Sequence, residues 1–145
     1  MYEYNEQFYP AFPPKAKPYV SVGLRYPEAV AHHVAHTYKV KKIYIIVSSS
    51  ISKTPYFKAL EKELYYDDNV EVVGVRKGIK SHTPWVDVLE IVKDMRRRRA
   101  EVIVTLGAGS LTDGAKVVSW VCIQFATCLC TLCNGTSNTD AYYRL

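Results

Sequence analysis

The sequence predicts an α/β fold in which a parallel β-sheet is flanked by helices. Apolar runs typical of buried strands alternate with helical segments three times along the chain, and the third strand leads into a glycine-rich turn. The chain has 145 residues, 48% of them hydrophobic, which is the size and composition of one globular domain. We therefore expect one α/β domain at residues 19–119, with a segment of different character on each side.

The first segment, residues 1–18, is predicted to be an extended N-terminal arm. It contains four prolines, which lack the amide donors that regular structure needs. A short alternating run at residues 18–23 predicts a strand, and residues 27–36 predict a helix with Pro27 in its first turn.

The continuous apolar run at residues 42–47 predicts a strand buried on both faces, followed by a serine-rich loop. A helix is expected at residues 55–66, where apolar residues share one stripe. A second strand is expected at residues 70–75, after an acidic turn.

The next helix is predicted to begin with Thr83 as its cap and Pro84 in its first position. It should end in four arginines, residues 96–99, which favour the negative end of the helix dipole. No aromatic residues are interleaved with these arginines, so we expect no nucleic-acid partner. The expected buried face consists of Val88, Leu89, Val92 and Met95.

The third strand, predicted at residues 101–106, enters the turn formed by Gly107 and Gly109, and a helix follows. Glycines allow backbone angles that other residues avoid, and the amides of residues 110–113 at a helix start could bind a phosphate. Similar turns also join strands and helices that bind nothing, so these residues alone leave both interpretations open. In a parallel sheet, the loops at residues 48–50, 77–82 and 107–110 should meet at one edge.

Metal binding is not the expected role of the histidines or cysteines. We expect no carboxylate or cysteine to converge on the three helical histidines, and the four cysteines form only one C-x-x-C pair. We expect the histidines to be partly exposed and the thiols to be reduced. The histidines in question are His32, His33 and His36, and the cysteines are Cys122, Cys128, Cys130 and Cys133.

Residues 120–145 form an apolar, cysteine-rich segment followed by a polar end. The apolar run falls just short of a membrane span and has no basic anchors, so no membrane insertion is expected. The N-terminus is polar and acidic and does not resemble a secretory signal. The lack of such a signal favours a cytoplasmic protein. The formal charge of +5 permits contact with nucleic acid but does not indicate it.

The run from Leu106 to Lys116, LGAGSLTDGAK, resembles the G-G-G-S-x-x-D-x-A-K signature of the iron-containing alcohol dehydrogenases, a family that includes maleylacetate reductases. Ala108 replaces the middle glycine of that signature. The resemblance covers roughly residues 15–119 and implies a Rossmann-like fold.

The resemblance also implies a dinucleotide cofactor, NADP or NAD. Gly107 and Gly109 would form the turn, and residues from Ser110 to Asp113 would hold the pyrophosphate. His82 matches a polar position beside the nucleotide. Ser49 matches the place of an aspartate that binds the adenosine ribose in NAD-preferring members, so its lack of charge predicts tolerance of NADP. The set implied to bind the cofactor is Ser49, His82, Gly107, Gly109, Ser110, Leu111, Thr112 and Asp113.

In this family, an all-helical second domain supplies an aspartate and histidines that hold iron or zinc. No histidine of this chain matches those ligands, and residues 120–145 form a divergent tail, so we expect neither a bound family metal nor turnover by the chain alone. A second chain could supply the helical domain, or the apolar tail could cause self-association. The alternative function is a non-catalytic small-molecule-binding or interaction protein on the inherited scaffold.

Overall fold

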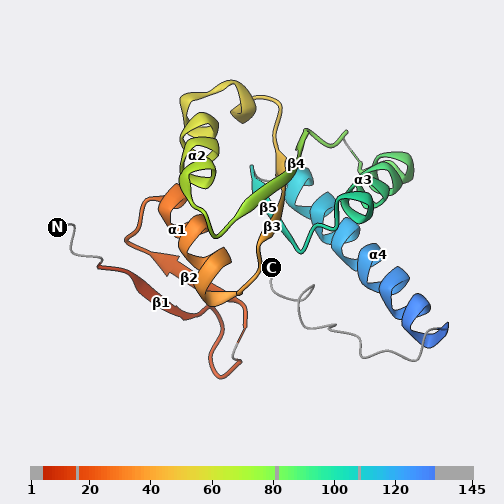
Figure 1. The fold of residues 1–145 in the computed structure, drawn as a ribbon, viewed down its shortest axis with the longest axis horizontal. Coiled ribbons are helices and arrows are strands. Elements are labelled where there is room, and N and C mark those ends of the chain that lie inside the picture. The colour runs from red at the N-terminus through yellow and green to blue at the C-terminus, as the bar shows by residue number, and fades with distance from the viewer. Residues whose placement is uncertain (1–4, 16, 81, 108, 133–145) are drawn as a thin grey trace.

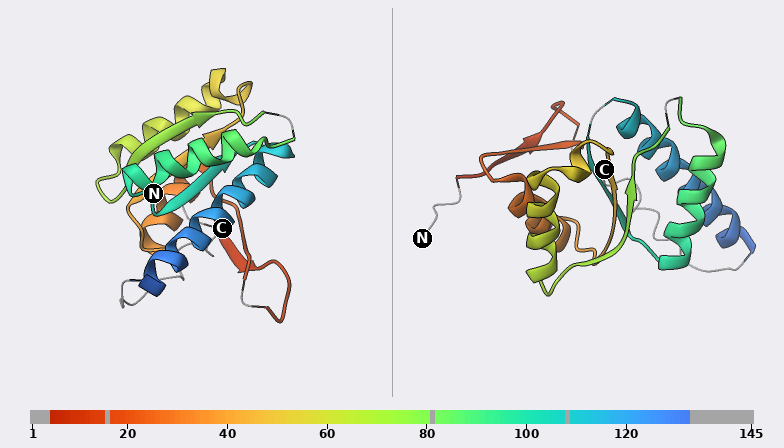
Figure 2. Two further views of the ribbon diagram at one scale, coloured as in Figure 1. Left: turned by 90° about the vertical axis from the view of Figure 1, so that its right-hand side faces the viewer. Right: turned by 90° about the horizontal axis from the view of Figure 1, so that it is seen from above.

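The protein forms a three-layer α/β structure, as the sequence predicts. The computed structural model describes residues 5–15, 17–80, 82–107 and 109–132, and residues 125–132 by their backbone alone. A central parallel sheet separates two pairs of helices, with α1 and α2 on one side and α3 and α4 on the other (Figure 1). The view from above shows the same layers (Figure 2).

The described elements alternate between strands and helices after an initial hairpin. The strands are β1 (Gln7–Pro10), β2 (Tyr19–Val22), β3 (Lys42–Val47), β4 (Glu71–Lys77) and β5 (Val102–Leu106). The helices are α1 (Tyr26–His32), the π-helix η1 (His33–Thr37), the 3₁₀-helix η2 (Ile51–Lys53), α2 (Pro55–Tyr66), α3 (Trp85–Arg98) and α4 (Ser110–Leu132).

The parallel sheet has the strand order β4-β3-β5, so the first of its strands in the sequence lies in the middle. The chain leaves β3 for β4 on one side, then crosses back to β5 on the other. This reversal creates a topological switch point between β3 and β5, where open α/β sheets bind ligands at the carboxyl ends of the strands. The candidate site is therefore the edge of the sheet at which the strands have their carboxyl ends.

Alternate residues of β3 supply two separate cores. Ile43, Ile45 and Val47 pack with α1, η1 and α2, whereas Tyr44 and Ile46 pack with α3 and α4. All five of these side chains are buried, which explains why the strand is a continuous apolar run rather than an alternating one.

Tyr44 brings a hydroxyl group into the second core, where the group finds a hydrogen-bond partner. Its hydroxyl donates a 3.0 Å hydrogen bond to Asp94 Oδ2 of α3. Burial, together with this carboxylate, raises the pKa of Tyr44 to about 12. Burial raises the pKa of Asp94, but hydrogen bonds from Arg98, Arg97 and Tyr44 outweigh it, so the net shift is downward.

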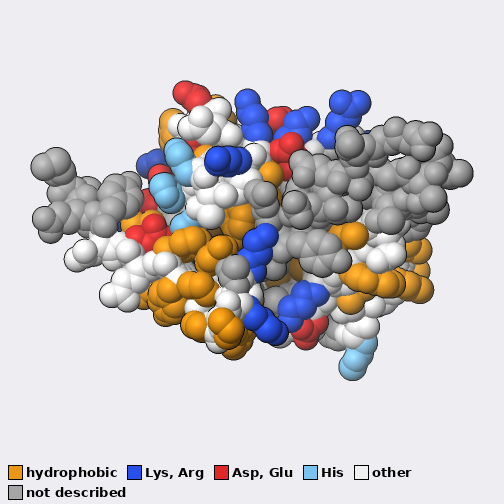
Figure 3. All heavy atoms as spheres, turned by 90° about the horizontal axis from the view of Figure 1, so that it is seen from below, with side chains coloured by type: hydrophobic (Ala, Val, Ile, Leu, Met, Phe, Trp, Pro, Cys, Tyr) orange, Lys and Arg blue, Asp and Glu red, His pale blue; other side chains and the backbone are white. Residues whose placement is uncertain are grey.

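The N-terminal arm is more ordered than the sequence predicts. Residues 7–10 form β1 and pair antiparallel with β2, which lies where a strand was expected. Glu6 anchors this hairpin, accepting hydrogen bonds from Ser21 (2.7 Å) and from the ring of His33 in η1 (2.6 Å). The expectation that no carboxylate converges on the helical histidines is therefore wrong for His33. The Ser21 bond is the main cause of the lowered pKa of Glu6; burial opposes it and His33 supports it. Figure 3 shows histidine side chains gathered beside acidic and hydrophobic ones on this side.

Helix α3 departs from its prediction in two ways. Leu89 was expected in the core but is 38% exposed, and Ile91 is buried instead. Thr83 is not the cap: Pro84 occupies that position, while Thr83 has a left-handed backbone (φ 46°) and its amide donates to the Lys80 carbonyl. The arginine run ends the helix as predicted, with Arg99 in a left-handed conformation after it.

Candidate functional site

The loops after β3 and β5 meet at the switch point of the sheet. The amide of Ser48 donates a 3.0 Å hydrogen bond to the carbonyl of Leu106, so the ladder between the strands continues into the loops. Gly107 follows with φ +155°, and a Cβ there would lie 3.2 Å from Leu111 and 3.4 Å from Ser48. A glycine is therefore needed where the chain passes between the loop and the helix.

Gly109 opens helix α4 and leaves free space above it. Its φ of +61° is left-handed, and a Cβ built on it would meet nothing within 4 Å. The turn thus combines an exposed backbone with the amino end of a 23-residue helix. Such helix ends bind anions through amides that have no intrahelical acceptor.

The four amides expected to face a phosphate are not equivalent. Those of Thr112 and Asp113 both donate to the Gly109 carbonyl, at 3.0 and 3.2 Å, and so close the first turn of α4. By position, the amides of Ser110 and Leu111 come before the first intrahelical bond. The Leu111 side chain is buried in the core, so only its backbone faces the turn. Asp113 is exposed and its carboxylate is 3.1 Å from Lys116 Nζ.

Ser49 lies against the loop after β4. The Gly78 amide donates a 2.6 Å hydrogen bond to the Val47 carbonyl, and a Cβ on Gly78 would come within 2.6 Å of Ser49 Oγ. Gly78 has φ +83°, which favours glycine, and the lack of a Cβ lets Ser49 approach its backbone closely. The serine is exposed at the edge of the sheet, as a side chain that meets a ligand must be.

His82 is exposed on the loop that leads to α3, with a left-handed backbone (φ 63°). This loop packs on α4, because a Cβ on Gly114 would lie 2.8 Å from Ile79 and 3.3 Å from Thr83. The buried Gly114 therefore lets the loop that carries His82 approach the first turns of α4. The structure thus brings the predicted positions from all three loops to one edge of the sheet.

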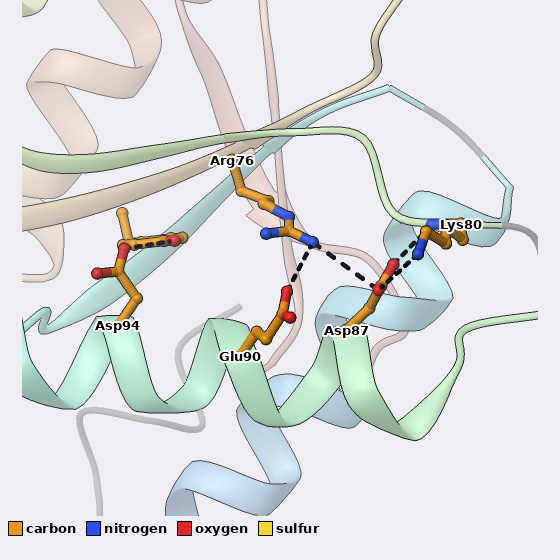
Figure 4. Close-up of polar contacts among 6 residues, drawn as sticks. Arg76, Lys80, Asp87, Glu90 and Asp94 are labelled. Atoms are coloured by element: carbon orange, nitrogen blue, oxygen red, sulfur yellow. Dashed lines mark hydrogen bonds and ion pairs between the residues drawn. The ribbon is translucent and has the colours of Figure 1, made fainter.

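Asp87 is a feature of this edge that the sequence analysis missed. It lies in the first turn of α3 and is only 3% exposed. Its Oδ2 accepts a 3.2 Å hydrogen bond from the Lys80 amide, and its Oδ1 is 3.7 Å from Lys80 Nζ and 3.9 Å from Arg76 Nη2 (Figure 4). Arg76 also pairs with Glu90 at 3.4 Å. The sequence did contain a signal for this residue: Asp87 follows soon after the proline that starts the helix, where the helix dipole favours an acidic side chain.

Chemically, this edge suits the binding of an anion. It offers helix-start amides, hydroxyls and lysines. The described residues contain no group of three or more His, Cys, Asp or Glu side chains that could hold a metal ion. None of the helices in the described part of the chain combines the length and hydrophobicity needed to cross a membrane.

Two surface cavities lie away from this edge. One, of about 280 Å³, is lined by the hairpin, α1 and β5, and contains Phe8 and His33. The other, of about 380 Å³, is lined by Arg96, Arg99 and Cys122 near the end of α3. Neither cavity includes a residue of the three converging loops. Ligands of open α/β sheets bind in a crevice at the carboxyl ends of the strands, so we place the candidate site at these loops rather than in either cavity.

Comparison with known proteins gives a consistent family assignment. The model of the iron-containing alcohol dehydrogenases matches residues 25–139, which extends beyond residue 119, where we expected the resemblance to end. That boundary also lies inside the continuous helix α4. No solved structure matches the chain significantly.

Among curated proteins, the chain is similar to Dehydrogenase FUM7 of Gibberella moniliformis and Dehydrogenase ALT3 of Alternaria alternata. It is 36% identical to the first over 125 residues, which are 86% of this chain and 28% of that protein. It is 43% identical to the second over 76 residues, which are 52% of this chain and 19% of that protein. The chain thus spans less than a third of either relative. With the family match over most of its length, this α/β chain belongs to the iron-containing alcohol dehydrogenases.

Proposed function

We propose that this chain is the NAD(P)-binding part of an oxidoreductase of the iron-containing alcohol dehydrogenase type. The observation that carries the proposal is the meeting of three loops at the switch point, with Gly109 open above the start of α4. The backbone around Ser110 and Leu111 would hold the pyrophosphate, and Ser49 and His82 would lie beside the rest of the nucleotide. When bound, the nicotinamide supplies hydride transfer.

We also propose that the 145-residue chain binds the nucleotide without turning over substrate. The relatives are named dehydrogenases, but the chain covers only 28% and 19% of their lengths. We expect alcohol or aldehyde turnover only when the metal-binding half of the family is present together with these residues.

Gly109 provides the sharpest test of the binding site. Asn and Asp tolerate its left-handed backbone best among other residues and have nearly the same shape, so Gly109→Asn and Gly109→Asp differ mainly in charge. A carboxylate next to a pyrophosphate should cost about 1–2 kcal/mol, or about a tenfold weaker NADPH affinity than the Asn variant. Calorimetric titration measures both values, and Gln124→Glu, exposed much further along α4, is the charge control.

Ser49 is proposed to permit NADP binding because it places no negative charge near the ribose. We expect Ser49→Asp to weaken NADPH relative to NADH by about tenfold, whereas the uncharged Ser49→Asn leaves their ratio nearly unchanged. If the wild-type chain binds neither nucleotide, the dinucleotide function is wrong, and the alternative of a non-catalytic interaction protein gains support.

A further inference from the structure

We propose that two copies of this chain form a two-fold symmetric dimer through the amino-terminal edge of the sheet, opposite the candidate nucleotide site. In this dimer, residues 65–68 at the end of α2, the tyrosine turn, dock against the cavity at the end of α3, the arginine cavity. The inference goes beyond the proposed function, because it assigns a partner to an edge that nucleotide binding does not use.

Both surfaces lie at the edge where the parallel strands begin (Figure 1). The tyrosine turn shortly precedes β4, and the lining of the arginine cavity includes residues 99–101, which directly precede β5. Since β4 and β5 lie on either side of β3, their starts are about 10 Å apart. A two-fold axis through the midpoint of the two surfaces, perpendicular to the line between them, places each tyrosine turn on the cavity of the other copy.

The tyrosine turn is an exposed aromatic and acidic surface. Tyr65 is 82% exposed and Tyr66 is 72% exposed, and their rings contact each other edge to face with centroids 5.4 Å apart. Asp67 and Asp68 follow at the carboxyl end of α2, where the helix dipole disfavours negative charge. Asp67 accepts hydrogen bonds within the turn from Asn69, but Asp68 is exposed and forms no ion pair among the described residues. Exposed tyrosines of this kind are typical of interface centres.

The arginine cavity has the size and charge to receive this turn. Its volume is about 380 Å³, whereas a cavity of about 150 Å³ can hold a benzene ring. Arg96 and Arg99 line it, and guanidinium groups bind both aromatic faces and carboxylates. Arg99 forms no ion pair with a described residue. The acidic lining residue, Glu101, already accepts hydrogen bonds from the amides of Lys41 and Lys42, at 2.7 and 2.8 Å, which compensate part of its charge.

The two surfaces are complementary in charge and sufficient in area. Docking would pair Asp68 with Arg99 of the second copy and place tyrosine rings beside guanidinium groups, at two symmetric contacts. Four tyrosine side chains of about 150 Å² each, with an equal area of the surfaces that cover them, give about 1,200 Å². This is the lower limit of a specific interface, so we expect a weak dimer.

Sedimentation velocity of the full chain over a range of concentrations tests the dimer. Asp68→Arg and Arg99→Asp each place like charges opposite each other at both contacts, so each should weaken self-association at least about tenfold. Asp also tolerates the left-handed backbone of Arg99. An equimolar mixture of the two variants restores opposite charges at both contacts and should form a heterodimer with about wild-type affinity. A folding defect cannot produce this recovery.

The double variant Tyr65→Ser with Tyr66→Ser should also dimerise at least about tenfold more weakly, because it removes the aromatic contacts. The matched controls are Tyr56→Ser, 68% exposed at the other end of α2, and Lys53→Asp, exposed at the opposite edge of the sheet. Both should stay within about twofold of the wild-type dissociation constant, and wild-type association should weaken as salt increases.

Two results overturn the dimer: a wild-type chain that stays monomeric up to about 0.3 mM, or a mixture of Asp68→Arg and Arg99→Asp that does not associate. Wild-type association that the double tyrosine variant retains in full also overturns it, because another surface then causes self-association. No nucleotide is present in these measurements, so their outcome is independent of the proposed nucleotide binding.

Discussion

The buried carboxylate of Asp87 should hold the loop after β4 in place, and its replacement tests this role quantitatively. The hydrogen bond from the Lys80 amide is 3.2 Å long and ends on a charged acceptor, so it is worth about 1.5–3 kcal/mol. The ion pairs with Lys80 and Arg76 are longer, at 3.7 and 3.9 Å, and the lysine is exposed, so they add less than about 1 kcal/mol.

Asp87→Ala is therefore expected to lower the free energy of unfolding by about 2–4 kcal/mol. Asp87→Asn should cost only about 1 kcal/mol, because its amide oxygen can still accept from the Lys80 backbone. Glu90→Gln, which changes an exposed partner of Arg76, should cost less than about 0.5 kcal/mol. Urea denaturation followed by circular dichroism measures all three.

The loop also carries part of the proposed nucleotide site, so NADPH affinity should decrease in the same order as stability. The reasoning is refuted if Asp87→Asn is as damaging as Asp87→Ala, since charge rather than the backbone hydrogen bond would then dominate. The reasoning is also refuted if Asp87→Ala has the same urea midpoint of unfolding as the wild type.

Three further predictions concern the core. Gly74→Ala would place a Cβ 2.5 Å from the ring of Tyr44, so it should destabilise the fold by about 1–3 kcal/mol in urea unfolding, and by much less in a Tyr44→Leu background. Because the pKa of Tyr44 is raised to about 12, its neutral hydroxyl contributes fully to the free energy of unfolding below pH 10, and this contribution is lost as pH rises toward 12. The loss amounts to about 2–3 kcal/mol, and Tyr44→Phe should flatten this decrease in stability. Burial raises the pKa of the Cys122 thiol to about 11, so in a chain whose other three cysteines are serine it should react with a thiol reagent at pH 8 far more slowly than in urea; equal rates would contradict its burial.

The elements that the sequence predicts best are those whose own residues carry the pattern. Strand β3 and helix α2 have the expected bounds, because a doubly buried strand and a proline-started amphipathic helix are recognisable locally. The contact that joins the β1–β2 hairpin to η1 links Glu6 with His33, 27 residues apart, which no local pattern reveals. Ile91 is buried and Leu89 is exposed because the packing of α3 on α4 decides which stripe of the helix faces inward.

At the site, the sequence located the glycine turn but not how its amides are used. Two of the four expected amides are needed to begin α4, since a helix must close its first turn before it can leave donors free. Asp87 was missed because a carboxylate in a first helical turn is usually explained by the helix dipole alone, and its burial depends on where the loop before it folds.

The sheet order bears on which ligand can use the whole site. The helix-start amides follow β5 and the Ser49 loop follows β3, which pairs with β5 in the sheet. Neighbouring strands are about 4.8 Å apart, so a ligand that contacts both loops must extend from one strand end to the next. A single inorganic phosphate can occupy only one of these positions, whereas a nucleotide carries groups that can reach both. We therefore expect inorganic phosphate to compete weakly with NADPH.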